Sequence, residues 1–374
     1  MIVSITNPVI ATWIFSSVFF IALALSIRPR IIAAWFPSSV SAELKGLAIL
    51  MIVLSHIGYF LVSDTRFLWP LSIAAGVGVN LFLFLSGFGL TVSQLQKDLS
   101  IWQFYKRRLW KLFVPFWLML LTFLVLDFFV LHLTYPWSYI GRAVSGIFNR
   151  ADLYQDINSP LWYLTFILGY YILFPLVFSR RRAWLSALLL YLAGYLFVYF
   201  EPAFFNNVFH LYKIHIIAFP LGVLAAWGLG RLPAAESLSG WSRGRTAILY
   251  YAALSACLAI FVYANINSGI GGSANFEQGM SLIAVLAIVG VFILKKVEFR
   301  LLYWFGIYSY EIYLWHWPIL YRYDIFYRFL PDTWGWLATI LYLALFLGLG
   351  RLMSGAVEYI SWLWSAARQV PAKK

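Results

Sequence analysis

The chain has 374 residues, of which 63% are hydrophobic and only 11% are charged. Soluble domains carry about 25% charged residues, so this composition excludes an ordinary water-soluble surface. The net charge is +13, but the Lys and Arg residues lie between apolar segments and form no basic face, which argues against a nucleic-acid partner. With a single cysteine, Cys257, an intramolecular disulfide framework is excluded too.

Apolar runs of about 20 residues follow one another along the chain and predict an all-α polytopic membrane protein. The first run has no Lys or Arg before it, whereas Arg28 and Arg30 follow it, so we expect a retained span and not a cleaved signal peptide. We expect about 11 spans, at roughly 9–27, 44–62, 73–95, 110–133, 160–178, 183–200, 213–230, 246–265, 279–294, 301–321 and 334–357.

The distribution of basic residues predicts the orientation of these spans. Of the 27 Lys and Arg residues, 21 fall in alternate connections on one side and only six on the other. Because cytoplasmic loops carry an excess of Lys and Arg, the N-terminus is expected outside and the C-terminus in the cytoplasm. Residues 1–43 then form an extra N-terminal span with its basic loop, 44–358 the main transmembrane domain, and 359–374 a short basic cytoplasmic tail.

The longest outer connection, about 134–159, combines aromatic residues with amides and carboxylates. That combination suits a sugar, which needs apolar contact together with hydrogen bonds. An interfacial aromatic belt would have a similar composition, so both interpretations stay open. The residues concerned are Tyr135, Trp137, Tyr139, Arg142, Asn149, Asp152, Tyr154, Asp156 and Asn158.

The second span begins with Lys45 and contains His56, eleven residues further on. At 1.5 Å per helical residue the two are about 16 Å apart and share a face, so Lys45 lies at the cytoplasmic interface and His56 near the midplane. A neutral histidine at that depth can act as a general base. The competing interpretation is a structural hydrogen bond to a neighbouring helix.

A basic run precedes the fourth span and contains Arg107, Arg108 and Lys111. Arg108 and Lys111 are three residues apart on a helix, so they share a face that suits a polyanion such as a phosphate group. Topogenic charge or binding of lipid headgroups explains such a run equally well.

The third and tenth spans also contain polar residues. Glu311 lies deep in the membrane, where a carboxylate is costly unless it is protonated or paired. His316 is expected towards the outer interface, between Trp315 and Trp317. The third span adds Asn80 and Ser86, and its glycines also permit close helix packing.

Six segments occur in an order that resembles the acyltransferase family 3 membrane proteins, and together they cover about residues 40–325. They are Lys45-Gly46 leading to His56, the stretch 81–88, the run 107–115 ending at Pro115, Trp162-Tyr-Leu followed by Tyr171 and Pro175, Phe219-Pro-Leu-Gly222, and 309–318 ending in Leu-Trp-His-Trp-Pro.

The resemblance implies an enzyme of the bacterial cytoplasmic membrane that moves an acyl group, commonly acetyl, from a cytoplasmic coenzyme A thioester to a sugar hydroxyl of an exported polysaccharide or glycolipid. His56 matches the essential histidine of the family. Lys45 stands where arginine is usual, and Arg108 with Lys111, next to Arg107, matches an Arg-x-x-Arg pair that meets the donor. Both lysines keep the charge but lose the bidentate geometry of arginine.

Partners implied in the same way are acetyl-CoA or another acyl-CoA as donor, membrane lipid, a glycan or lipid-linked saccharide as acceptor, and other polysaccharide-biosynthesis proteins; no metal and no nucleic acid are expected. The residues expected to meet the acceptor are Asn80, Ser86, Trp162, Trp315 and His316.

In one position the chain departs from the family pattern. The fifth span has Ile167 where the family often has glutamate, so we hypothesise that Glu311 supplies the catalytic carboxylate. Two other functions stay open. A proton-coupled transporter or flippase could use Lys45, His56 and Glu311 as a path, although no inverted repeat is evident. A polymerase or ligase of lipid-linked glycans would leave the basic run unexplained.

Overall fold

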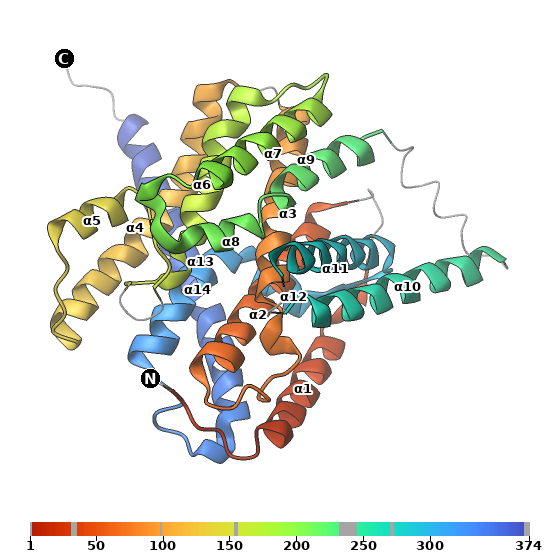
Figure 1. The fold of residues 1–374 in the computed structure, drawn as a ribbon. Coiled ribbons are helices and arrows are strands. Elements are labelled where there is room, and N and C mark those ends of the chain that lie inside the picture. Colours follow the sequence, from red (N-terminus) through yellow and green to blue (C-terminus); the bar gives the residue numbers. More distant parts are fainter. Residues whose placement is uncertain are drawn as a thin grey trace.

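A computed structural model describes residues 2–30, 36–97, 99–152, 156–231, 245–269 and 273–369, and these are mostly helical (Figure 1). Tyr154 and residues 370–374 of the basic tail lie outside the described residues. The elements are α1 (Pro8–Leu25), β1 (Ile27–Pro29), α2 (Ser38–Ser55), α3 (Ala75–Gln96), α4 (Ile101–Val130), α5 (Trp137–Val144), α6 (Trp162–Val177), α7 (Ala183–Phe200), α8 (Phe209–Lys213), α9 (Ala218–Leu229), α10 (Arg245–Asn267), α11 (Ala274–Leu294), β2 (Val297–Phe299), α12 (Arg300–Ile307), α13 (Ser309–Pro318) and α14 (Gly335–Gln369).

Ten helices in the described part of the chain are long and apolar enough to cross a membrane, which confirms an all-α multi-pass membrane protein. The predicted span 301–321 is different, because it is divided into α12, α13 and a π-helical turn, η6 (Ile319–Tyr323). Tyr308 has φ −108° and ψ 14°, outside helical values, and therefore separates α12 from α13. Which terminus faces the cytoplasm stays a prediction from the charge distribution.

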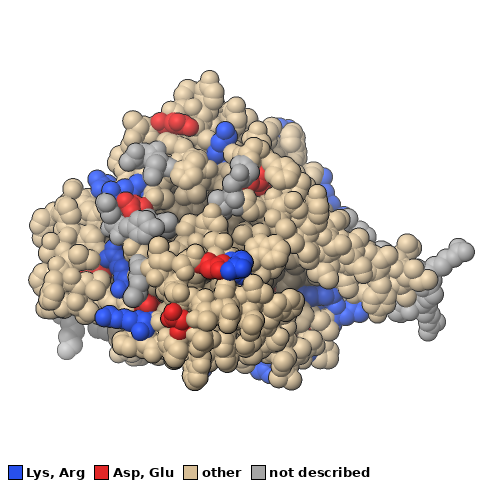
Figure 2. Space-filling view, turned by 60° about the horizontal axis from the view of Figure 1, so that its bottom comes forward, with Lys and Arg blue, Asp and Glu red and all other residues tan. Residues whose placement is uncertain are grey.

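The helices α2, α3, α12 and α13 form the centre of the bundle, and α1 and α10 lie at its edge (Figure 1). Most of α2 is buried by its neighbours, whereas α1 and α10 expose most of their apolar side chains. Figure 2 shows a surface of mainly uncharged residues in which charged side chains occur in small separate groups. Such a surface is suited to contact with lipid. Several of the polar groups, Lys45, Asn80 and His316 among them, lie on the central helices.

Glycines allow the central helices to cross at backbone contact. A Cβ atom added to Gly222 of α9 would lie 2.0 Å from the carbonyl oxygen of Phe84 in α3, and one added to Gly87 of α3 would lie 2.2 Å from the carbonyl oxygen of Phe219. Close crossings of this kind rely on small residues in membrane proteins. Gly46 of α2 makes the same kind of close backbone contact with α12. This contact sets the position of the helix that carries Lys45 and leads to His56.

The loops at the Lys45 end of α2 contain two short strands that the sequence analysis did not predict. β1 pairs with β2 in antiparallel register, and Arg28 bonds Glu298 across the pair at 2.8 Å. Buried Glu43, in the first turns of α2, accepts from the Lys295 Nζ and from the backbone N–H of Phe299, both at 2.6 Å. These bonds tie the start of α2 to the segment between α11 and α12.

Replacing Gly222 by alanine is expected to destabilise the protein by about 1–3 kcal/mol, because the added methyl group overlaps the α3 backbone. Gly228 of the same helix is the matched control, since an added Cβ there has nothing within 4 Å. Thermal denaturation in detergent should lower the Tm of Gly222→Ala and leave that of Gly228→Ala at or above the wild-type value. Equal Tm values for the two variants would contradict the role given to this crossing.

Candidate functional site

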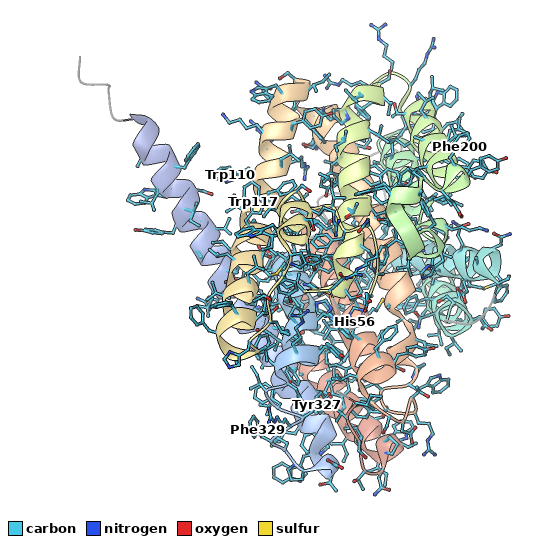
Figure 3. All side chains as sticks on the ribbon, turned by 60° about the vertical axis from the view of Figure 1, so that its left-hand side comes forward. His56, Trp110, Trp117, Phe200, Tyr327 and Phe329 are labelled. Carbon is cyan, nitrogen blue, oxygen red and sulfur yellow. The ribbon has the colours of Figure 1, made fainter. Side chains whose placement is uncertain are left out.

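His56 lies at a change in helix geometry. The α-helix α2 ends at Ser55, and His56 begins a π-helical turn, η1 (His56–Leu61). His316 lies near the end of α13, which also continues as a π-helical turn, and η1 and η6 are in contact. π-Helical turns are rare and frequently mark functional sites. Figure 3 shows His56 inside the bundle, between the level of Trp110 and Trp117 and that of Tyr327 and Phe329.

The two histidines are bonded to each other. Nδ1 of His56 lies 2.7 Å from Nε2 of His316. The two rings are parallel, with an interplanar angle of 0° and centroids 4.9 Å apart. His316 is fully buried, whereas His56 keeps part of its side chain exposed. Each residue was expected at a functional site from the sequence, but their contact was not expected.

The hydrogen bonds determine which nitrogen of each ring carries a proton. Nδ1 of His316 lies 2.8 Å from the backbone oxygen of Tyr313, and a carbonyl oxygen can only accept. His316 therefore carries its proton on Nδ1, and its Nε2 is an acceptor. The bond between the rings then needs a proton on Nδ1 of His56. In this neutral pair the remaining nitrogen, Nε2 of His56, holds a lone pair.

A proline and an asparagine hold His316 in place. Pro318 has no N–H to donate to the carbonyl group of Leu314, one helical turn earlier. The side chain of buried Asn158 donates to that carbonyl oxygen instead, at 2.9 Å. Asn158 belongs to the connection 134–159, so this connection is joined to the helix that carries His316.

A buried ion pair holds the same connection from its other end. Arg322, in η6, pairs with Asp127 near the end of α4, and both side chains are buried. Asp127 also accepts from the hydroxyl groups of Tyr135 at 2.5 Å and Tyr323 at 2.7 Å. Arg322 donates to the backbone oxygen of Asp156 at 2.6 Å. Both carboxylate oxygens of Asp127 thus accept from at least one donor, as a carboxylate removed from water requires.

A cavity of about 790 Å³ opens beside this ion pair. The cavity is lined by Leu131, Leu133, Thr134, Tyr135, Pro136, Ser138, Tyr139, Arg142, Asn149, Arg150, Tyr321 and Arg322. Tyr321 stacks on Trp317 with centroids 5.5 Å apart, and Trp317 meets His56 edge to face at 5.1 Å. Two aromatic rings therefore separate the cavity from the histidine pair.

The opposite end of the site is basic. Arg108 and Lys111 of α4 lie close enough to Lys45 of α2 for their charges to repel. Within the described residues, none of the three forms an ion pair with a carboxylate. Arg107 is exposed on the same turn of α4. Three cations gathered without a carboxylate favour binding of an anion.

Tyrosines on one face of α13 connect the basic end to the histidines. Tyr310, Tyr313 and His316 are spaced three residues apart and so follow one side of the helix. The Tyr310 hydroxyl donates to the backbone oxygen of Leu112, the residue after Lys111, at 2.7 Å. Tyr313 donates to the backbone oxygen of Pro160 at 2.6 Å, so this face also contacts the turn that precedes α6.

Asn80 and Trp162 meet at a third histidine, His215, which the sequence analysis missed. The Nδ1 of His215 bonds the Oδ1 of Asn80 at 2.8 Å, and the amide of Asn80 donates to Ser281 at 2.8 Å. Trp162 stacks on the His215 ring at 5.6 Å. A histidine within an apolar run, here at the start of the predicted span 213–230, was the signal that could have found it.

Three other predicted residues lie apart from the histidine pair. Ser86 hydrogen-bonds the hydroxyl of Tyr163, and Trp315 points towards α14, where its Nε1 lies 3.2 Å from the sulfur of Met353. Glu311 has no hydrogen bond to His56 or His316, and neither histidine bonds a carboxylate within the described ranges. The roles predicted for Ser86, Trp315 and Glu311 stay predictions.

Comparison with known proteins adds one match. The family model of the acyltransferase family 3 domain matches residues 44–354, which include both histidines, the basic cluster and Glu311. No curated protein and no solved structure matches the chain. The match begins one residue before Lys45 and leaves α1 outside it.

Proposed function

The chain belongs to acyltransferase family 3 and is a membrane acyltransferase, and we propose that it transfers an acyl group, in the simplest case acetyl, from acyl-CoA to a sugar hydroxyl of a cell-surface or exported glycan. The observation that carries the proposal is the bonded pair of His56 and His316, which leaves a basic lone pair on Nε2 of a partly exposed histidine. Such a nitrogen can take the proton of a hydroxyl group that attacks a thioester.

The basic cluster of Lys45, Arg108 and Lys111 is the proposed site for the phosphates of the donor. The charges of Arg108 and Lys111 repel that of Lys45, and none of the three has a carboxylate partner among the described residues. Because α2 is a continuous helix from Lys45 to Ser55, the cluster stays about 16 Å from His56 along the helix. That distance suits the extended pantetheine arm, so the thioester would reach the histidine while the phosphates stay at the membrane surface.

Acyl transfer then needs one base that also serves as an acid. Nε2 of His56 accepts the proton of the sugar hydroxyl as its oxygen attacks the thioester carbonyl carbon. The C–S bond of the resulting tetrahedral intermediate breaks, and the thiolate takes the proton from Nε2 to give free coenzyme A. The transfer is balanced and regenerates the neutral histidine without an acyl-enzyme intermediate.

His316 is a positioning residue in this scheme. Its neutral Nε2 accepts from Nδ1 of His56 and so presents Nε2 of His56 to the substrate. When His56 becomes protonated, the same bond becomes charge-assisted and therefore stronger. The backbone oxygen of Tyr313 holds His316 in the required tautomer, as a carboxylate does in a serine-protease triad. Glu311 remains a second hypothesis for the group that tunes His56.

Replacing His56 by alanine is expected to abolish glycan acylation, because the proton acceptor is lost, while the protein still inserts and expresses. Mass spectrometry of surface and lipid-linked glycans, with and without the variant gene, measures the acylation. Wild-type levels of acylated glycan in His56→Ala would refute the mechanism.

The role of His316 predicts a graded effect. His316→Leu should lower kcat by roughly 10²–10⁴-fold, since Nδ1 of His56 loses its acceptor, with little change in KM for the donor. His316→Gln should recover part of this loss, because its amide oxygen can accept the same bond. Equal kcat values for the Leu and Gln variants would exclude the hydrogen bond as the cause. In the same assay, full activity of Glu311→Gln would end the hypothesis for Glu311.

Charge removal at the basic cluster is expected to weaken donor binding. The variants Lys45→Gln, Arg108→Gln and Lys111→Gln should each raise the apparent Kd for acetyl-CoA about tenfold. The measurement is the thermal stabilisation of the purified protein as a function of acetyl-CoA concentration. Lys106→Gln, an exposed cation of the same helix, is the control and should bind normally. If acetyl-CoA stabilises neither the wild type nor Lys106→Gln, the enzyme assignment fails and a transporter or flippase becomes the better interpretation.

A further inference from the structure

The cavity beside Arg322 has a lining that favours an anion. Arg142, Arg150 and Arg322 all line it, and among the described residues no carboxylate does. The other polar side chains of the lining are neutral hydroxyl and amide groups, which suit the hydroxyl groups of a saccharide. A volume of about 790 Å³ lies in the range of small-molecule sites and is large enough for a sugar with an attached charged group.

The three arginines differ in how far their charges are already neutralised. Arg322 is buried and pairs with Asp127, so its charge is balanced. Arg150 pairs with Asp156 at 3.2 Å and leaves 39% of its side chain exposed. Arg142 is exposed, and no described residue hydrogen-bonds or pairs with its guanidinium. The lining therefore keeps an excess of positive charge, with Arg142 and Arg150 able to reach a ligand.

Exposed apolar residues border the same cavity. Leu131, Leu133 and Pro136 form part of its lining. Next to them in the chain, Phe129 and Trp137 are 69% and 85% exposed, an arrangement suited to contact with acyl or prenyl chains. Charged and apolar surfaces thus meet at one opening, as a ligand with a phosphate group and a lipid tail would require.

The cavity is also connected to the proposed chemistry. Tyr321 lines it and stacks on Trp317, which contacts His56. The connection 134–159, which supplies Arg142 and Arg150, is bonded to α13 through Asn158 and to η6 through Arg322. Two aromatic side chains, Tyr321 and Trp317, lie between a saccharide held here and the base that would activate its hydroxyl group.

We propose that this cavity is the acceptor subsite and that it takes a lipid-linked saccharide through its phosphate, with Arg142 and Arg150 as the phosphate ligands. The inference rests on the proposed function and names the class of its acceptor. A carboxylate of a sugar acid would present the same negative charge to the two arginines. The apolar border of the cavity favours the lipid-linked phosphate over that source.

The test uses the full chain in phosphatidylcholine nanodiscs and geranylgeranyl diphosphate as the probe. Titration followed by intrinsic tryptophan fluorescence should give a Kd about tenfold higher for Arg142→Gln than for the wild type, because a charge-assisted bond to phosphate is lost. Arg142 is exposed and unpaired, so its replacement should leave folding unaffected. The double variant with Arg150→Gln should bind more weakly still.

Two controls make the test specific. Arg66→Gln removes an exposed arginine that pairs with Asp64 and does not line the cavity, and it should bind the diphosphate as the wild type does. Geranylgeraniol, which lacks the diphosphate, should bind weakly and equally to every variant. Equal Kd values for the diphosphate in wild type and Arg142→Gln, or equal affinity for alcohol and diphosphate, would overturn the proposal.

Further measurements distinguish a phosphate ligand from a carboxylate ligand, and failure of this inference from failure of the proposed function. If trigalacturonate binds in an Arg142-dependent manner and the diphosphate does not, the assignment to lipid-linked phosphate is overturned in favour of a carboxylate. If acylation requires His56 but diphosphate binding ignores Arg142, the inference fails and the proposed function stands. Arg142-dependent binding by a protein that does not respond to acetyl-CoA would instead overturn the proposed function while supporting the subsite.

Discussion

The bond between His56 and His316 is the interaction on which the rest of the site depends. A single imidazole within a membrane can carry its proton on either nitrogen, and only one tautomer presents a base to the substrate. A chain of hydrogen bonds selects that tautomer without a carboxylate: His56 donates to His316, and His316 donates to the backbone oxygen of Tyr313. A neutral chain is well suited to the bilayer, where a buried charge is costly.

The connection 134–159 joins this bond to the surface of the protein. Pro318 frees a carbonyl oxygen in α13, and Asn158 uses it, while Arg322 bonds the backbone of Asp156. The connection 134–159, whose composition suits a sugar, is thereby held against α13, the helix whose His316 positions His56. The carbonyl oxygen freed by Pro318, a buried ion pair and a cavity rich in arginine thus belong to one structural unit. Its proposed role is to bring the acceptor hydroxyl to the base.

Much of the fold could be predicted because membrane burial is a simple constraint. Runs of apolar residues indicated the helices, and ten of them are long enough to span. The predicted span 301–321 was harder, since hydrophobicity does not show the interruption at Tyr308 or the π-helical turn after Pro318. Glu43 and Asp127 are buried in ion pairs with residues far away in sequence, and no local pattern indicates such partners.

The sequence by itself determined the class of protein, the helix that carries Lys45 and His56, and the basic run that reaches Lys111, because composition and helical spacing are local properties. Only the tertiary structure decided that His316 contacts His56, that the charges of Arg108 and Lys111 come within electrostatic range of Lys45, and that Glu311 is bonded to neither histidine. The physical reason is that these relations depend on how helices cross, and the crossings are set by glycine contacts and buried hydrogen bonds between segments that are distant in the chain.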